Sequence, residues 1–226
     1  MTDLAHPATD YAVVERESPR IMERNLRVAA QLWASAIVFF FFAFLFAYFY
    51  LRALNQTHLW KPHGVDAPVA TGTLVAALVV ASAIVAWVGA RRLGDGNEAA
   101  WRSAGLAALG LGVAALVVQV IQWSTIDFGP TDGGFASVFL GWTVLYAIFV
   151  LGSLYWLETL VATAFRHRGA GPSGHEPGAA SGDPHRTGDD IALPLSLQPA
   201  GASAFAFQWA VLAGVGVVTW IVLYLL

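Results

Sequence analysis

The sequence predicts an all-α membrane protein in which five transmembrane helices form a bundle, with the N-terminus inside the cell and the C-terminus outside. The chain has 226 residues, of which 57% are hydrophobic and 12% are charged, whereas about 25% of the residues of a soluble domain are charged. Five apolar stretches reach the roughly 20 residues that a helix needs to cross a bilayer. They lack the period-two alternation of membrane strands, so they fit helices.

These stretches divide the chain into four parts. We expect a cytoplasmic tail at residues 1–25, a four-helix transmembrane part at 26–165, a disordered cytoplasmic loop at 166–204 and the fifth transmembrane helix at 205–226. The apolar stretches of the four-helix part are residues 26–51, 69–90, 101–123 and 135–165. The loop is rich in Gly, Pro and polar residues, a composition that buries too little apolar surface to fold.

The first three predicted helices differ in the surface that they offer. The run from Ile37 to Tyr50 is mostly aromatic and offers a large rigid surface to lipid or to a partner subunit. The second and third helices carry small residues at i, i+4 and i+8, a spacing that lets helices approach closely in a bilayer but that also arises by chance in Ala-rich helices. These candidate helix-packing residues are Ser82, Ala86 and Ala90, and then Ala104, Ala108 and Gly112.

Few polar side chains lie within the spans. Glu158 is the one acid well inside an apolar stretch, two turns before Arg166. Its ordinary interpretation is a carboxylate near the membrane interface, and its functional interpretations are a subunit contact or a proton-uptake surface. Gln119 and Gln122 share one face of the third helix. They are candidates for interhelical hydrogen bonds and for contact with lipid or another subunit.

The distribution of basic residues predicts the orientation. Ten of the 12 Lys and Arg residues lie on the side of the N-terminus, and only Arg52 and Lys61 lie on the other. The positive-inside rule then places the N-terminus in the cytoplasm of a bacterial cell, with the chain crossing the inner membrane several times. Four basic residues beside the spans are candidate partners of phospholipid phosphates: Arg24, Arg27, Arg91 and Arg92.

The composition argues against several kinds of site. The chain has no cysteine, and all six histidines lie outside the apolar stretches, so we expect no catalytic, metal or cofactor site in this chain. There is no basic patch with interleaved aromatic residues, so nucleic acid is not an expected partner.

Several segments resemble subunit III of the haem-copper oxidases, the cytochrome c oxidase subunit 3 family. The first span closes with Ala47-Tyr48-Phe49, the third ends Gln119-Val-Ile-Gln122-Trp123, and the fourth opens Gly134-Phe-Ala-Ser137-Val-Phe139. Their order and spacing are similar to those of the family over residues 24–165 and 203–226. The sequence predicts five spans, as in the five-helix members.

The ionisable signature residues of that family are absent from this sequence. Its two acids fall on Ala36 and Gln122, and the two histidines of its fourth-helix segment fall on Tyr146 and Phe149. The histidine and aspartate of its last helix fall near Ala210 and Ala213. None of the roles of those residues transfers to this chain.

The resemblance implies a non-catalytic accessory subunit that stabilises subunit I and binds lipid. The expected partners are subunits I and II of a respiratory oxidase, phospholipids and the membrane, with haem and copper in the partner subunits only. Two alternatives stay open: an accessory subunit associated with a nitric oxide reductase, and a small membrane transporter. A transporter would normally show an inverted repeat or matching broken helices, and neither is visible in the sequence.

Overall fold

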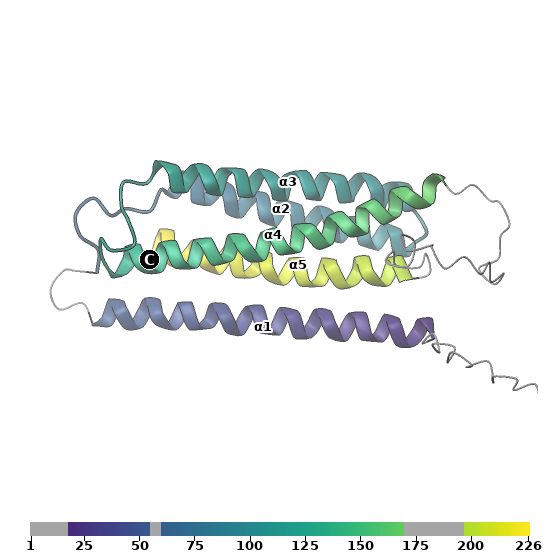
Figure 1. Cartoon of the computed structure of the whole chain (residues 1–226), viewed down its shortest axis with the longest axis horizontal. Coiled ribbons are helices and arrows are strands. Elements are labelled where there is room, and N and C mark those ends of the chain that lie inside the picture. Colours follow the sequence, from purple (N-terminus) through teal and green to yellow (C-terminus); the bar gives the residue numbers. More distant parts are fainter. Residues whose placement is uncertain (1–17, 55–59, 170–196) are drawn as a thin grey trace, which may run out of the picture.

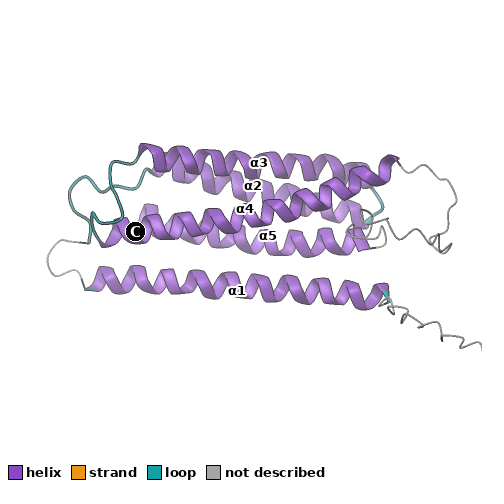
Figure 2. Cartoon of the chain, in the orientation of Figure 1, coloured by secondary structure: helices purple, strands orange, loops and turns teal. Residues whose placement is uncertain are grey.

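A computed structural model of the chain describes residues 18–54, 60–169 and 197–226. Within these residues the chain forms five long helices and no strand (Figures 1 and 2). They are α1 (Pro19–Ala53), α2 (Val69–Gly94), α3 (Glu98–Thr125), α4 (Gly134–Gly169) and α5 (Gln198–Trp220), which continues as the π-helix η2 (Ile221–Leu225). All five long helices are apolar enough to cross a membrane. The prediction of an all-helical protein with five spans is confirmed.

The helices are longer than the apolar stretches that predicted them. Residues 19–25 of the predicted tail belong to α1, and both ends of the predicted loop, residues 166–169 and 198–204, belong to α4 and α5. The expected ends of the tail and of the loop therefore differ from the observed helix ends. Apolarity marks only the part of a helix inside the hydrocarbon core, whereas the backbone hydrogen bonds of the helix continue beyond that part. Proline in the first turn of α1 and of α5 suits a helix start, where no donor is lost. The predicted disorder falls mainly on residues 170–196, outside the described residues.

The five helices lie side by side along the long axis of the molecule (Figure 1). The antiparallel pair α2 and α3 packs most closely, α5 lies against α2, α1 and α4, and α4 bridges α3, α5 and α1. We call the end at which α1, α3 and α5 begin the arginine-rich end, because eight arginines of the described residues lie there. They are Arg20, Arg24, Arg27, Arg91, Arg92, Arg102, Arg166 and Arg168.

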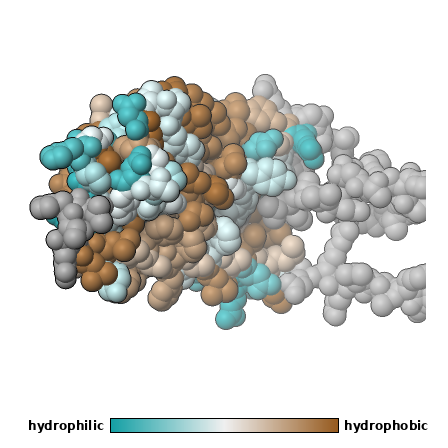
Figure 3. Space-filling view, turned by 60° about the vertical axis from the view of Figure 1, so that its left-hand side comes forward, coloured by the Kyte–Doolittle hydropathy of each residue, from teal (hydrophilic) through white to brown (hydrophobic). Residues whose placement is uncertain are grey.

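The side wall of the bundle is apolar. In Figure 3 hydrophobic residues cover the body, and hydrophilic residues gather at the near end, opposite the arginine-rich end. On α1, Ile37, Phe41 and Tyr48 face the other helices and are buried, whereas Phe39, Phe42 and Phe46 face outward. Such a wall is the surface that a lipid bilayer or a partner's membrane helices would cover.

A buried polar chain joins three helices at the centre. Trp209 Nε1 on α5 donates to Ser82 Oγ on α2 at 3.1 Å. Ser82 Oγ in turn donates to the Ala108 carbonyl on α3 at 2.7 Å. Trp209, Ser82 and Ala108 are fully buried. Because hydrogen bonds between membrane helices hold them in register, this chain fixes how α5, α2 and α3 align along the bundle axis.

The predicted small residues of α3 lie at two helix contacts. Ala104 faces α2, where a Cβ added to Gly89 would lie 2.6 Å from the Ala104 Cβ. Gly112 faces α4, where an added Cβ would overlap the Leu154 side chain. The small side chains therefore set the distance of α3 from both neighbours.

Replacing Gly112 with valine should push α3 and α4 apart. We expect the free energy of unfolding to fall by about 1 to 3 kcal/mol, the usual cost of overpacking a core, in a detergent-denaturation titration followed by circular dichroism. Gly110 is the matched control on the same helix, because a Cβ there would meet no atom within 4 Å. An equal loss of stability from Gly110→Val and Gly112→Val would contradict the packing role of Gly112.

Candidate functional site

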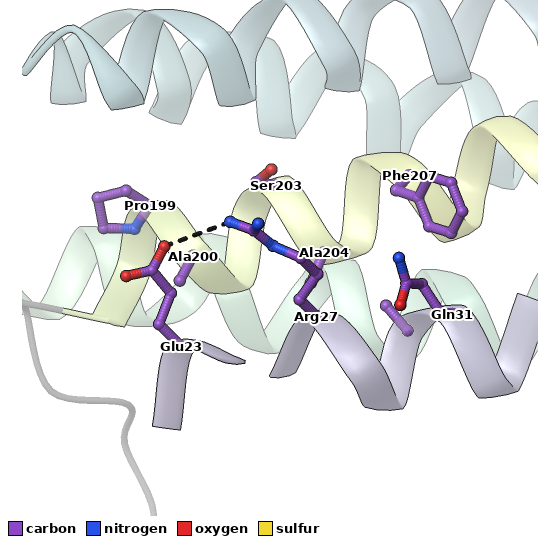
Figure 4. A pocket seen from close by; sticks show the side chains of 9 residues that line it. Glu23, Arg27, Gln31, Pro199, Ala200, Ser203, Ala204 and Phe207 are labelled. Carbon is purple, nitrogen blue, oxygen red and sulfur yellow. Dashed lines mark ion pairs between the residues drawn. The ribbon is translucent and has the colours of Figure 1, made fainter. Parts of the chain in front are cut away.

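A cleft between α1 and α5 opens at the arginine-rich end (Figure 4). It encloses about 320 Å³, and its polar lining comes from Glu23, Arg27 and Gln31 on α1 and from Ser203 on α5. Arg27 Nη2 lies 3.5 Å from Glu23 Oε1, and the guanidinium extends across the cleft toward α5. Both side chains of this pair are more than half exposed, so they are free to exchange partners with a ligand.

The remaining wall of the cleft is apolar. Ala30 and Ala204 are buried where α1 and α5 touch, and Phe207 lies farthest from the helix ends. The cleft therefore combines donors for an oxygen-rich group, one carboxylate for a cationic group, and an apolar wall that runs toward the middle of the bundle. A molecule with a charged head and an apolar tail matches this combination.

The other three predicted arginines lie apart from the cleft. Arg91, at the end of α2, stacks on Trp87 with its guanidinium carbon 3.7 Å from the ring centroid. Arg92 and Arg24 are exposed. Of the four predicted arginines, only Arg27 lines the cleft.

Gln119 and Gln122 lie inside the bundle. Gln122 Oε1 accepts hydrogen bonds from Gln119 Nε2 at 2.6 Å and from the Tyr224 hydroxyl of η2 at 3.0 Å. Its Nε2 donates to Thr71 Oγ1 of α2 at 2.9 Å. Both glutamines are buried by this chain's own helices. Gln119 and Gln122 are therefore not accessible to lipid or to another subunit, and instead they join α3, α2 and η2.

Glu158 faces outward and lies deeper than its distance from Arg166 suggests. Where α4 packs against α3, the Val161 side chain lies beside Gly105 and the Leu154 side chain lies beside Gly112. Glu158 is thus level with Ala108, whose carbonyl binds Ser82 near the midpoint of α2. On α4 itself Glu158 lies between the middle of the span and Arg166, the last residue of that span. An acid costs at most about 2.5 to 3.5 kcal/mol in lipid, the value for the centre of a spanning helix.

No group of three or more potential metal ligands occurs within the described ranges. The sequence profile of the family described as Cytochrome c oxidase subunit III matches residues 12–175. The chain belongs to the cytochrome c oxidase subunit III family. The match includes α1 to α4 in full.

A curated relative, the cytochrome c oxidase subunit 3 of Didelphis virginiana, is 24% identical to this chain over 153 residues. The aligned part makes up 65% of this chain and 54% of the relative. The chain thus spans about half the length of the curated relative that it matches.

Two of the positions at which the resemblance places histidines of the family pack between helices here. The Tyr146 hydroxyl donates to the Leu212 carbonyl of α5 at 3.2 Å, and the Phe149 ring lies 5.5 Å from the Phe41 ring of α1. Ala213 is buried, whereas Ala36 and Ala210 are exposed. At Tyr146 and Phe149, therefore, one hydrogen bond joins α4 to α5 and aromatic packing joins α4 to α1.

Sequence reasoning missed the α5 side of the cleft. Ser203 was assigned to the loop, since the fifth helix was predicted to begin at residue 205. The segment Leu197-Gln198-Pro199 held the missing signal, because proline favours the first turn of a helix. A helix start at this proline places Ser203 and Phe207 one turn apart on one face.

Proposed function

We propose that this chain is a non-catalytic subunit III of a bacterial haem-copper oxidase, in which it stabilises the haem-bearing subunit I and retains phospholipid. The observation that carries the proposal is the family match across α1 to α4. The outward aromatic residues of α1 support it, since Phe39 is 78% exposed and neighbouring rings share its face. A partner's membrane helices or lipid would cover such a surface.

The orientation in the membrane is part of this proposal. The arginine-rich end would face the cytoplasm and the C-terminal end the periplasm, because eight described arginines lie at one end, and Arg52 and Lys61 at the other. Cytoplasmic loops carry the excess of basic residues in inner-membrane proteins. Under this orientation the cleft between α1 and α5 opens toward the inner leaflet.

Purification of the tagged full chain from its native membrane in mild detergent tests the proposed function. The reduced-minus-oxidised spectrum of the purified material should show bands of haem a, o or b, and a subunit I homologue should be present in stoichiometric amount. A colourless preparation from a membrane whose oxidase remains intact would overturn the proposal.

The cleft gives the lipid part of the proposal its own test. Replacing Arg27 with glutamine should weaken retention of an anionic phospholipid by about fivefold, because one basic side chain near a charged membrane surface contributes about 1 kcal/mol. Lipid phosphorus per haem in the purified complex is the measurement. Arg20→Gln is the matched control, since Arg20 is exposed on the same helix but does not line the cleft. If the ratio of lipid phosphorus to haem were unchanged in the Arg27→Gln complex, the cleft would not be a site of lipid retention.

A further inference from the structure

The outward face of α4 carries a regular seam that the proposed function does not explain. Seven residues recur along it at alternating intervals of four and three. They are Val144, Ile148, Leu151, Tyr155, Glu158, Ala162 and Phe165. All except the partly buried Ala162 are exposed, with Tyr155 at 70%. A repeat of 3.5 residues keeps one seam of a helix against a second helix that coils around it.

Glu158 distinguishes this seam from a face that meets only lipid. It is the one acid of the seam, and no ion pair involves it within the part of the chain that the structure describes. It lies level with Ala108 and Ser82 (above), and Ser82 is 13 residues from Val69 and 12 from Gly94 on α2. Ala108 is six residues from Arg102 on α3, so Glu158 lies about 9 Å deeper in the bundle than that arginine by helical rise.

None of the ion pairs formed by the described arginines involves Glu158. Arg91 is stacked on Trp87, and Arg102 pairs with Glu98 at 3.3 Å. Arg166 lies on α4 itself, eight residues from Glu158, which corresponds to about 12 Å along the helix. Ionisable residues within spanning segments usually pair with one another or with backbone carbonyls, and Glu158 has no such ion pair within the described residues.

We propose that the seam of α4 is the docking surface for a membrane-spanning helix of another subunit, and that this helix presents a basic side chain to Glu158. The charge of Glu158 selects the basic partner, and the apolar positions on both sides supply the helix-packing surface. Tyr155, one turn from Glu158, offers a hydroxyl to the same contact. The inference rests on the proposed function only in taking the partner from the same complex.

Dissociation of the purified complex tests the role of the carboxylate. Glu158→Leu should release the partner subunit from the tagged chain at least tenfold faster in detergent, because loss of one member of a buried charge pair acts mainly on the dissociation rate. Glu158→Asp should stay close to the wild type. The double variant Glu158→Leu/Val113→Glu is the matched control, since it moves the acid to the outward face of α3, where Val113 is 48% exposed. It should dissociate as fast as Glu158→Leu.

Site-specific cross-linking identifies the occupant. The chain has no cysteine, so Ala162→Cys places a single thiol on the seam, and Val113→Cys places one on the control face. A thiol-linked photoreactive probe in the native membrane should join Ala162→Cys, but not Val113→Cys, to a spanning segment with Lys, Arg or His within about one helical turn of the cross-link.

The outcomes separate the inference from the proposed function. Cross-linking to lipid only, or to a second copy of this chain, would overturn the docking inference, as would equal dissociation rates for Glu158→Leu and the wild type. In each of those cases the proposed function would still be supported if haem co-purified with the wild-type chain. If the wild-type preparation were colourless but Ala162→Cys still cross-linked to a spanning helix with a basic residue, the proposed function would be overturned and the docking inference supported.

Discussion

Replacing Trp209 with alanine is expected to lower the free energy of unfolding by about 3 to 5 kcal/mol, the range for truncating a fully buried Trp or Phe. Trp209 is fully buried in α5, and its ring stacks on Phe205 with the centroids 5.8 Å apart. Its indole N–H also supplies the hydrogen bond to Ser82 that aligns α5 with α2. Alanine would leave a cavity at the contact and remove the bond together with the packing.

Two further variants separate packing from hydrogen bonding at this position. Trp209→Phe keeps an aromatic ring but removes the donor and part of the indole volume. It should cost at least the roughly 0.6 to 2 kcal/mol of a hydrogen bond between membrane helices, yet less than Trp209→Ala. Trp220 is the control, since its Nε1 also donates to a hydroxyl of α2, Thr73 Oγ1 at 2.9 Å, but at an exposed site. If Trp220→Ala were as destabilising as Trp209→Ala in a denaturation titration, the central position of Trp209 would have no special importance.

Replacing Gln122 with leucine is expected to lower the free energy of unfolding by about 1 to 3 kcal/mol, the cost of leaving buried polar groups unsatisfied. Gln122 is fully buried and binds Gln119, Thr71 and Tyr224 at once. Leucine has a similar volume, so the main effect is the loss of partners for groups that stay buried. Chemical denaturation in detergent measures the change.

A double variant tests the hydrogen-bond explanation directly. Gln119→Leu/Gln122→Leu removes donor and acceptor together, and replacing both partners by apolar groups can be nearly neutral. The double variant should therefore lose less stability than the sum of the two single variants. Ser124→Ala is the control, because Ser124 is exposed and donates only to the Ile121 carbonyl of its own helix. Strict additivity of the two glutamine variants would contradict a shared network.

Much of the fold could be predicted from the sequence. The five apolar stretches located five helices, because a spanning segment must be both long and apolar whatever it packs against. The ends of α1, α4 and α5 could not be placed from apolarity, since these turns lie beyond the apolar stretches. For that reason Ser203, which lines the cleft, was not among the predicted site residues.

The candidate site was harder to predict, because polar residues in a membrane helix do not reveal which way they point. Gln122 and Glu158 both lie within apolar stretches, yet Gln122 is buried among three helices and Glu158 faces outward. In a soluble helix the polar face marks the surface. In a spanning helix the inward and outward faces are both apolar, so composition does not separate them.

The sequence by itself determined that this is a five-helix membrane protein of the subunit III family, since length, apolarity and motif order are properties of the chain alone. Only the tertiary structure decided which residues meet. It joined Trp209 to Ser82 and Ala108, brought Arg27 to the cleft beside Ser203, and placed Glu158 level with Ala108 on the outward seam of α4. The physical reason is that helix register and rotation depend on close packing and hydrogen bonds between segments far apart in the chain, which the apolar pattern of each segment does not encode.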